Sequence, residues 1–342
     1  MTHARRGFAA LALIGATLSP SAGAADDGLA RCAKLESVDE RLACYDELAR
    51  RPSSAEAPAE PASDSAFLTR AWKLGPADGD VRRMADILSY RPNYIDARWT
   101  DGANVRPRSP STGRATAQDL NRWEAKLQAS FKTELISRQA FERARITPVL
   151  GNFGIESVRL WFGYTQSMQW QVFNHGQSRP MRDTNYEPEA ILTFGTGNED
   201  GLKLINLGLS HQSNGIDPRE HRGWSRWYVQ GGWEWGRFSV LGRLWHIIPQ
   251  SDDDNPNIDT FYGHGDVVAR YQSARGIVTS VLLRGNDSTG LGFVQLDMAT
   301  APLRMLGGLK FHVQFTSGYG ETLIDYNFRQ RTVGVGVSFG DW

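Results

Sequence analysis

The stretch WEAKLQASFKTELI, residues 123–136, alternates apolar or small side chains with polar ones over its whole length. Successive side chains of a β-strand point to opposite faces, so a period of two indicates a strand with two unlike faces. The first face carries Ala125, Leu127, Ala129, Phe131, Thr133 and Leu135, and the second carries Glu124, Lys126, Gln128, Ser130, Lys132 and Glu134. The stretch therefore predicts a long strand with one apolar and one charged face.

The same period continues along the chain on both sides of this stretch. In SVRLWFGYTQSMQWQVF, residues 157–173, it runs longer than a strand of an ordinary soluble sandwich requires. Further strands are expected near residues 91–99, 187–197, 202–212, 224–236, 237–248, 260–273, 275–284, 289–300, 306–317 and 330–340. The total is about twelve, an even number, as in the barrels of bacterial outer membranes.

The connections between these strands also alternate. Short connections alternate with longer polar ones. The short ones lie around residues 198–201, 236–237, 274–275 and 302, and the longer ones cover 214–223, 249–259 and 318–329. Short turns on one side and long loops on the other are typical of outer-membrane barrels, and 11 tryptophans can supply the aromatic girdles. We therefore expect an all-β fold over residues 90–342, a transmembrane antiparallel β-barrel of about twelve strands, with a soluble β-sandwich as the alternative.

The first 24 residues have the pattern of a secretory signal peptide. Arg5 and Arg6 precede the apolar run FAALALIGATL, and the small residues AGA at 22–24 form a cleavage site, so the mature chain is expected to begin at Ala25. Beyond this segment the sequence has no stretch of about 18 consecutive apolar residues. An exported chain of this kind is either soluble outside the cytoplasm or a barrel, and the strand pattern favours the barrel.

Residues 25–89 are expected to form a short helical N-terminal extension on the periplasmic side. Cys32 and Cys44 lie within it, and in an exported chain a lone pair most often forms a disulfide, here between two short helical segments. The following segment RPSSAEAPAEPASDSA, residues 51–66, has the composition of a flexible linker. The 38 basic and 38 acidic residues of the chain balance, so the composition predicts no nucleic-acid partner.

A histidine and a serine lie two residues apart at the end of a predicted strand. In KLINLGLSHQS, residues 203–213, Leu207, Leu209, His211 and Ser213 share the apolar face, which in a barrel faces lipid. A polar pair at the lipid boundary is costly, but a hydrolase whose substrate is the lipid itself needs a general base and a nucleophile there. The alternative is a passive channel or structural barrel, in which both are polar girdle residues.

Gln166 is the one strongly polar residue on the lipid-facing side of the predicted strand over residues 157–173. A side-chain amide in a membrane needs a hydrogen-bond partner, and an interface between two barrels supplies one. The position therefore predicts a homodimer interface, although a single tolerated glutamine gives the same pattern.

Six short segments of the chain together resemble the outer-membrane phospholipase A family. They are YTQ (164–166), SRPMRDTNYEP (178–188), HQSNG (211–215), W-x-R (224–226), DDNP (253–256) and GYGETLIDYNF (318–328). The resemblance spans about residues 90–342. It implies an outer-membrane barrel of Gram-negative bacteria that hydrolyses phospholipids at sn-1 and sn-2, and lysophospholipids, as a calcium-dependent homodimer.

The resemblance also assigns roles to residues in and after the HQSNG segment. Ser213 falls on the family nucleophile, His211 on its general base, and the backbone N–H of Gly215 on the oxyanion hole. The third member of the family site is an asparagine that fixes the tautomer of the histidine, and Ser225 occupies its position here. A hydroxyl is a weaker and more freely rotating acceptor than an amide oxygen, so this departure predicts a modest role for Ser225.

The calcium ligands that the resemblance implies are a backbone carbonyl at Ile216, a loop serine whose position is His221, and a carbonyl of the partner chain at Ser178. Calcium prefers oxygen ligands, so His221 is a poor replacement, and Glu220 or Asp217 is expected to supply a carboxylate instead. The acidic segment over residues 251–259 is expected to be a loop, because Asp, Asn and Pro are turn formers.

Overall fold

The structure is a computed structural model of the chain, and it describes residues 32–33, 35, 37–50, 67–75, 86–179, 181–216, 219–251 and 253–342. The chain divides into two compact units, residues 1–64 and residues 65–342. The predicted signal peptide over residues 1–24 and the predicted linker over residues 51–66 lie outside the described residues. None of the helices in the described ranges combines the length and the hydropathy that a bilayer span requires.

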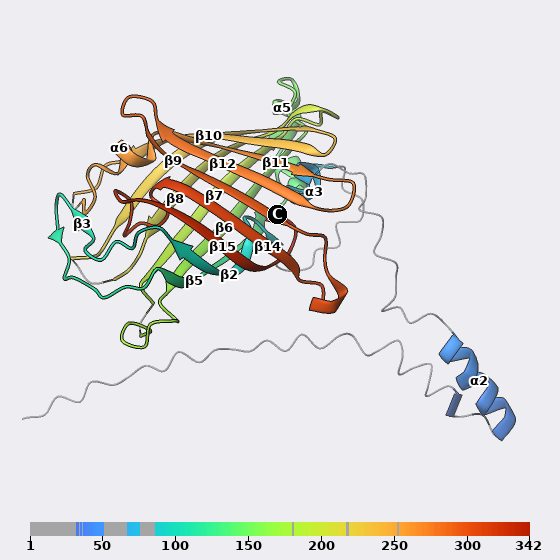
Figure 1. Cartoon of the computed structure of the whole chain (residues 1–342). Helices are drawn as coiled ribbons and strands as arrows, with labels where there is room; N and C mark the ends of the chain where they lie inside the picture. The colour runs from blue at the N-terminus through green and yellow to red at the C-terminus, as the bar shows by residue number, and fades with distance from the viewer. Residues whose placement is uncertain are drawn as a thin grey trace, which may run out of the picture. The chain divides into compact units, whose positions relative to one another are not determined.

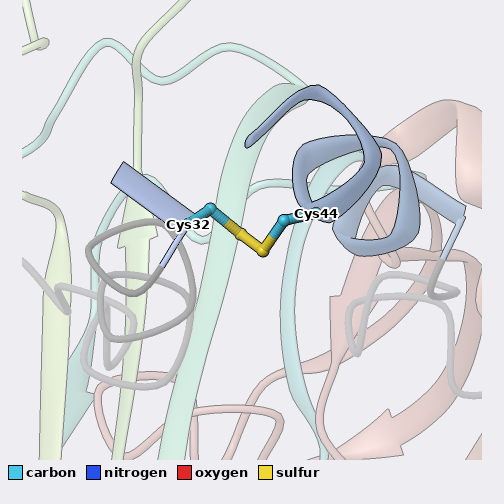
Figure 2. The surroundings of a disulfide bond; sticks show 2 residues. All are labelled: Cys32 and Cys44. Carbon is cyan, nitrogen blue, oxygen red and sulfur yellow. A yellow bond between two sulfur atoms is a disulfide. The ribbon is translucent and has the colours of Figure 1, made fainter. Parts of the chain in front are cut away.

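The first unit contains helix α2 (Val38–Arg50) and a disulfide. Cys44 lies on this helix and is joined to Cys32, with the two Cα atoms 5.6 Å apart (Figure 2). That separation is ordinary for a disulfide. The predicted disulfide is thus confirmed, and it joins α2 to a short helical segment at Cys32 and Ala33.

The second unit is built from antiparallel strands that form one large sheet (Figure 1). Its strands are β1 (Ile87–Ser89), β2 (Asn93–Thr100), β5 (Trp123–Ile136), β6 (Ser157–Trp170), β7 (Asp183–Gly195), β8 (Gly201–Ser213), β9 (Gly223–Trp235), β10 (Phe238–Ile248), β11 (Gly265–Gln272), β12 (Val278–Asn286), β13 (Leu291–Ala299), β14 (Lys310–Tyr319) and β15 (Arg329–Phe339). The connections hold the small hairpin β3 (Arg108–Ser109) and β4 (Gly113–Arg114), the helices α4 (Arg138–Arg143), α5 (Ile146–Gly151) and α6 (Ile258–Tyr262), and the 3-10 helix η2 (Arg304–Leu306).

The sheet closes into a barrel between its first and last strands. β1 and β2 pair with successive parts of β5, with Ser89 opposite Phe131 and Tyr94 opposite Gln128, so they are two parts of one interrupted strand. The other edge of β2 pairs with β15. The 13 sheet segments of the described residues therefore make twelve barrel strands, because β1 and β2 count as one. This confirms the predicted barrel and excludes the sandwich.

Side chains of each strand alternate between the lumen and the outer surface. On β5 the charged side chains Glu124 and Lys126 are each 3% exposed, whereas Leu135 on the opposite face is 58% exposed. Glu124 forms an ion pair with Arg98, and Lys126 Nζ lies 3.0 Å from Glu321 Oε1. Buried charges require such partners. The charged face predicted for residues 123–136 therefore lines the lumen, and its apolar face is the outer surface.

The boundaries of several strands differ from the prediction; β7, for example, begins at Asp183 and not near residue 187. β11 begins at Gly265 and not near residue 260, because α6 precedes it and Gly263, with φ of 66°, ends that helix. β14 begins at Lys310 and not near residue 306, because η2 occupies the preceding residues. The alternation of polar and apolar residues can continue by chance through a short helix. The alternation therefore does not show where the helix ends and the strand begins.

A short N-terminal segment packs into the lumen at the end of the barrel opposite the long loops. Helix α3 (Phe67–Ala71) places the backbone N–H of Leu68 3.0 Å from Glu234 Oε1, to which it donates. Trp72, just beyond α3, lies under Lys132, whose Nζ is 3.3 Å from the ring centroid, a cation–π contact. Residues 67–75 thus belong to the barrel unit, which begins before the predicted boundary at residue 90.

Side chains also fill much of the lumen between the two ends of the barrel. Two cavities lined by lumen residues have volumes of about 120 and 160 Å³, each the space of a few water molecules. At the wall of the first, Glu187 forms ion pairs with Arg91, at 2.6 Å, and with Arg226. A lumen occupied by paired charged side chains does not favour the alternative of a passive channel, which requires an open pore.

Candidate active site

Strands β8 and β9 bring the predicted histidine and serines together at the loop end of the barrel. In the register of this pair, His211 lies opposite Ser225 and Ser213 lies opposite Gly223. His211 is exposed on the same face of β8 as Leu209, which is 58% exposed, while Ser210 between them is 4% exposed. The strand parity is as predicted, so His211 projects from the outer surface and not into the lumen.

The imidazole of His211 is held by its cross-strand neighbour. Its Nδ1 lies 2.9 Å from Ser225 Oγ, which is hydrogen-bonding distance. A neutral imidazole has one N–H donor and one acceptor nitrogen. With Nδ1 donating to Ser225, Nε2 is left as the acceptor nitrogen of the ring, the form that a general base requires.

Ser213 lies at the last position of β8, where the strand enters the loop. Its Oγ has no hydrogen-bond partner among the described residues. Opposite it, Gly223 has no side chain, and a Cβ added there would lie 3.5 Å from Ser213 Cβ. The absence of a side chain at Gly223 thus lets the ring of His221 and Ser213 lie close together, each 3.5 Å from where that Cβ would be.

The loop after Ser213 is fixed at its base by Asn214, whose role the residue pattern does not predict. The side chain of Asn214 is 1% exposed. Its Nδ2 donates to Asp183 Oδ1 at 3.2 Å and to the carbonyl of Glu220 at 2.9 Å, and its Oδ1 accepts from the backbone N–H of Arg222 at 2.9 Å. Its place in the segment HQSNG was the available signal.

Gly215 follows in a conformation that favours glycine. Its φ is 61°, and a Cβ there would lie 3.5 Å from the ring of Tyr186. An L-residue in this left-handed region is strained, so glycine allows the chain to turn two residues after Ser213. A backbone N–H at such a turn is a candidate oxyanion donor, because it is fixed before the reaction begins.

The residues predicted to bind calcium differ in how well they suit it. His221 is unsuited, because its Nδ1 is bonded to the carboxylate of Asp254 and nitrogen is a poor ligand for calcium. The carbonyl oxygen of Ser178 accepts from Trp170 Nε1 at 2.9 Å and keeps a second lone pair. Glu220 Oε1 accepts from Gln118 Nε2 at 2.9 Å.

Of the other two candidates, Ile216 is described and offers a carbonyl oxygen, and Asp217 lies outside the described residues. Among the described residues, no three or more His, Cys, Asp or Glu side chains form a group that could hold a metal ion. The oxygen donors of Ile216, Ser178 and Glu220 are nevertheless of the hard type that calcium binds. The chemistry of this donor set therefore fits calcium, and the nitrogen of His221 does not.

The barrel surface beside His211 is apolar. Along β8 and β9, Leu207, Trp227 and Val229 are 44%, 47% and 41% exposed on the outer face. Such side chains suit contact with acyl chains in the hydrocarbon layer. The polar side chains of the site thus lie at the loop end of an apolar outer surface that suits contact with lipid.

Sequence comparisons identify the family to which the chain is related. The sequence model of the phospholipase A1 family matches residues 68–339. A protein of Neisseria meningitidis serogroup B assigned to the same enzyme class is 33% identical over 380 residues, which cover 95% of this chain and 94% of that protein. The phospholipase A1 of Proteus vulgaris is 36% identical over 258 residues, which cover 75% of this chain and 82% of that enzyme.

Solved structures show the same fold. Outer membrane phospholipase A from Escherichia coli matches with a TM-score of 0.63 at 30% identity, over 75% of this chain and 98% of that one. The Salmonella typhi outer membrane phospholipase, a dimer with bound calcium, matches with a TM-score of 0.64 at 30% identity, over 78% and 95% of the two chains. The chain therefore belongs to the phospholipase A1 family and is an outer-membrane β-barrel enzyme that hydrolyses phospholipids.

Proposed function

We propose that this enzyme hydrolyses the acyl esters of phospholipids at both sn-1 and sn-2, and those of lysophospholipids, with Ser213 as nucleophile and His211 as general base. The observation that supports these roles is the position of His211 on the outer face, with Nδ1 2.9 Å from Ser225 Oγ and Ser213 two residues further along β8. A site on an open outer surface can receive either ester of a lipid. Covalent labelling of Ser213 by a sulfonyl fluoride tests the assignment.

In the proposed reaction, Ser213 Oγ attacks the ester carbonyl carbon while His211 Nε2 takes the hydroxyl proton. The carbonyl oxygen becomes an oxyanion that accepts a hydrogen bond from the backbone N–H of Gly215. Collapse breaks the bond to the glycerol oxygen, which takes the proton from His211 and leaves as a lysophospholipid. Water, deprotonated by His211, then attacks the acyl-enzyme, and the fatty acid leaves with Ser213 regenerated.

Ser225→Asn is expected to preserve or raise the rate, because an amide oxygen is a stronger and less freely rotating acceptor for the Nδ1–H of His211. Ser225→Ala is expected to lower kcat by about tenfold, the loss of one modest hydrogen bond. His211→Ala removes the base and is expected to cost about 10³-fold or more. Fatty-acid release from mixed micelles of phospholipid and detergent measures all three.

The matched control for these variants is Ser251→Ala, an exposed serine in the loop after β10. It is expected to keep the activity of the unchanged enzyme. If Ser225→Ala proved as inactive as His211→Ala, the modest role of Ser225 would be wrong.

We also propose that the enzyme binds calcium at the loop end of the barrel. The carbonyl oxygen of Ile216 and the carboxylate of Glu220 would hold it, with the carbonyl of Ser178 of the partner subunit. When bound, the ion supplies positive charge that stabilises the oxyanion. The calcium-bound Salmonella typhi relative supports this proposal.

The active form is proposed to be a homodimer with Gln166 at its interface. In the single chain, Gln166 Oε1 accepts a hydrogen bond from the Tyr164 hydroxyl at 3.2 Å, and its Nε2 lies 3.6 Å from Met168 Sδ. A thioether is a weak acceptor, so the amide N–H groups retain capacity for a partner across an interface. The Salmonella typhi relative, which is a dimer, supports the homodimer.

Gln166→Leu is expected to raise the dissociation constant of the dimer by about three- to tenfold, the effect of losing a side-chain hydrogen bond in a membrane. Sedimentation equilibrium in detergent with calcium measures it. Tyr271→Phe is the matched control, because Tyr271 is 50% exposed on β11, across the barrel from β6. An unchanged dissociation constant for Gln166→Leu would place the interface elsewhere.

A further inference from the structure

Gln250 contacts the proposed active site, although neither the residue pattern nor the family resemblance gives it a role. Its Nε2 donates a hydrogen bond to Ser225 Oγ at 2.9 Å. The same oxygen lies 2.9 Å from His211 Nδ1. Side chains from β8, from β9 and from the residues just after β10 therefore form one connected series at the outer surface.

The end of β10 determines where Gln250 lies. Ile248, the last residue of β10, is directly opposite Ser225 in the sheet register. Pro249 follows, and a proline fixes its own φ near about −65° and keeps the residue before it extended. The backbone between Ile248 and Gln250 therefore has little freedom. It brings the carboxamide of Gln250 to Ser225 even though Gln250 itself is exposed.

Ser225 needs such a contact if it is to hold an imidazole. A serine side chain has three staggered rotamers, and only one of them can place Oγ next to a given ring nitrogen. Ser225 is only half-buried, so packing restricts this choice weakly. Its hydroxyl oxygen has two lone pairs and can accept from Gln250 Nε2 and from the Nδ1–H of His211 at the same time.

We propose that Gln250 is a positioning residue for ester hydrolysis. It holds Ser225 in the rotamer that meets Nδ1 of His211, and Ser225 in turn orients the imidazole toward Ser213. The resemblance implies one asparagine at the position of Ser225 in related enzymes. In this chain a hydroxyl on β9 and an amide just beyond the end of β10 together take the place of that single side chain. The inference rests on the proposed roles of His211 and Ser213.

The test compares Gln250→Leu, Ser225→Ala and the double variant in the purified full-length enzyme, in detergent with calcium. The readouts are kcat and KM for a soluble short-chain p-nitrophenyl ester. Gln250→Leu is expected to lower kcat by about three- to tenfold and to change KM by less than about twofold. In the Ser225→Ala background the same change is expected to cost nothing further, because the contact through which it acts is absent.

Ser251→Ala, next to Gln250, is the matched control and is expected to keep the kcat of the unchanged enzyme. An unaltered kcat for Gln250→Leu would overturn the inference. An equal loss of kcat when Gln250→Leu is added to Ser225→Ala would also overturn it, because a general loss of structure would lower kcat whether or not Ser225 is present.

Ser213→Ala, assayed in parallel, distinguishes failure of the proposed catalytic roles from failure of the role of Gln250. If it stays active, the proposed catalytic roles fail and this inference fails with them. If it is inactive while Gln250→Leu is unaltered, only the role of Gln250 fails.

Discussion

Ser213→Ala is expected to lower phospholipid hydrolysis by about 10³-fold or more, because it removes the hydroxyl that is proposed to form the acyl-enzyme. The Ser213 hydroxyl has no hydrogen-bond partner among the described residues, and Ser213 lies opposite Gly223. Fatty-acid release from phospholipid in mixed micelles, with calcium present, measures the loss. Binding of the micelle surface is expected to be unchanged, since the apolar outer face is untouched.

The same variant gives a second readout that does not depend on turnover. In the unchanged enzyme, a sulfonyl fluoride is expected to attach to Ser213, and mass spectrometry of the peptide that contains it identifies the residue. His211→Ala is expected to slow labelling sharply, because the base that activates the hydroxyl is absent. Substantial activity in Ser213→Ala, or label on another serine, would falsify the assignment. Ser251→Ala controls for the substitution of an exposed serine at the same end of the barrel.

Removal of calcium is expected to lower activity by about 10²-fold or more, the scale of losing one strong stabiliser of an oxyanion. The assay follows hydrolysis after addition of excess chelator and then after addition of calcium or magnesium. Calcium is expected to restore activity and magnesium to restore little, because magnesium requires a smaller and more regular set of ligands. Full activity in excess chelator would exclude a role for the ion.

Glu220→Gln tests the proposed carboxylate ligand. It is expected to raise the calcium concentration needed for half-maximal activity by about tenfold, because the ion loses a charged oxygen ligand. Glu199→Gln is the matched control, an exposed glutamate in the short connection between β7 and β8 at the other end of the barrel. If both variants showed the same calcium requirement, Glu220 would not be a ligand.

The barrel and the outward direction of His211 could be predicted from the sequence because lipid and lumen impose opposite demands on neighbouring residues. Each strand of such a barrel must alternate between apolar side chains that face lipid and polar side chains that face the lumen. This alternation can be seen in the sequence without knowing which strands pair. The same pattern requires partners for the charged inner face but does not name them: Lys126 pairs with Glu321, which lies in the loop after β14.

Other parts of the site could not be predicted because they depend on contacts between separate segments. Gln250 meets Ser225 across 25 positions of sequence, and Asp254 meets His221 across 33. The acidic residues after β10 look like ordinary turn formers, and Gln250 looks like an ordinary exposed loop residue, until the register of β9 and β10 is known. Helix α3 was missed for a related reason: five residues are too few to show a helical period, and its position depends on Glu234 and Lys132.

The pairing of β2 with β15, where Ala97 lies opposite Val335, has a consequence for how the enzyme is made. Until the final strand has been synthesised, one edge of β2 has no neighbour, and unsatisfied backbone groups are not tolerated in hydrocarbon. A chain that stops before β15 presents two open edges, which favour aggregation over insertion. We therefore expect chains that end before β15 to insert poorly into the bilayer, so that only chains that include this strand would reach its lipids as active enzyme.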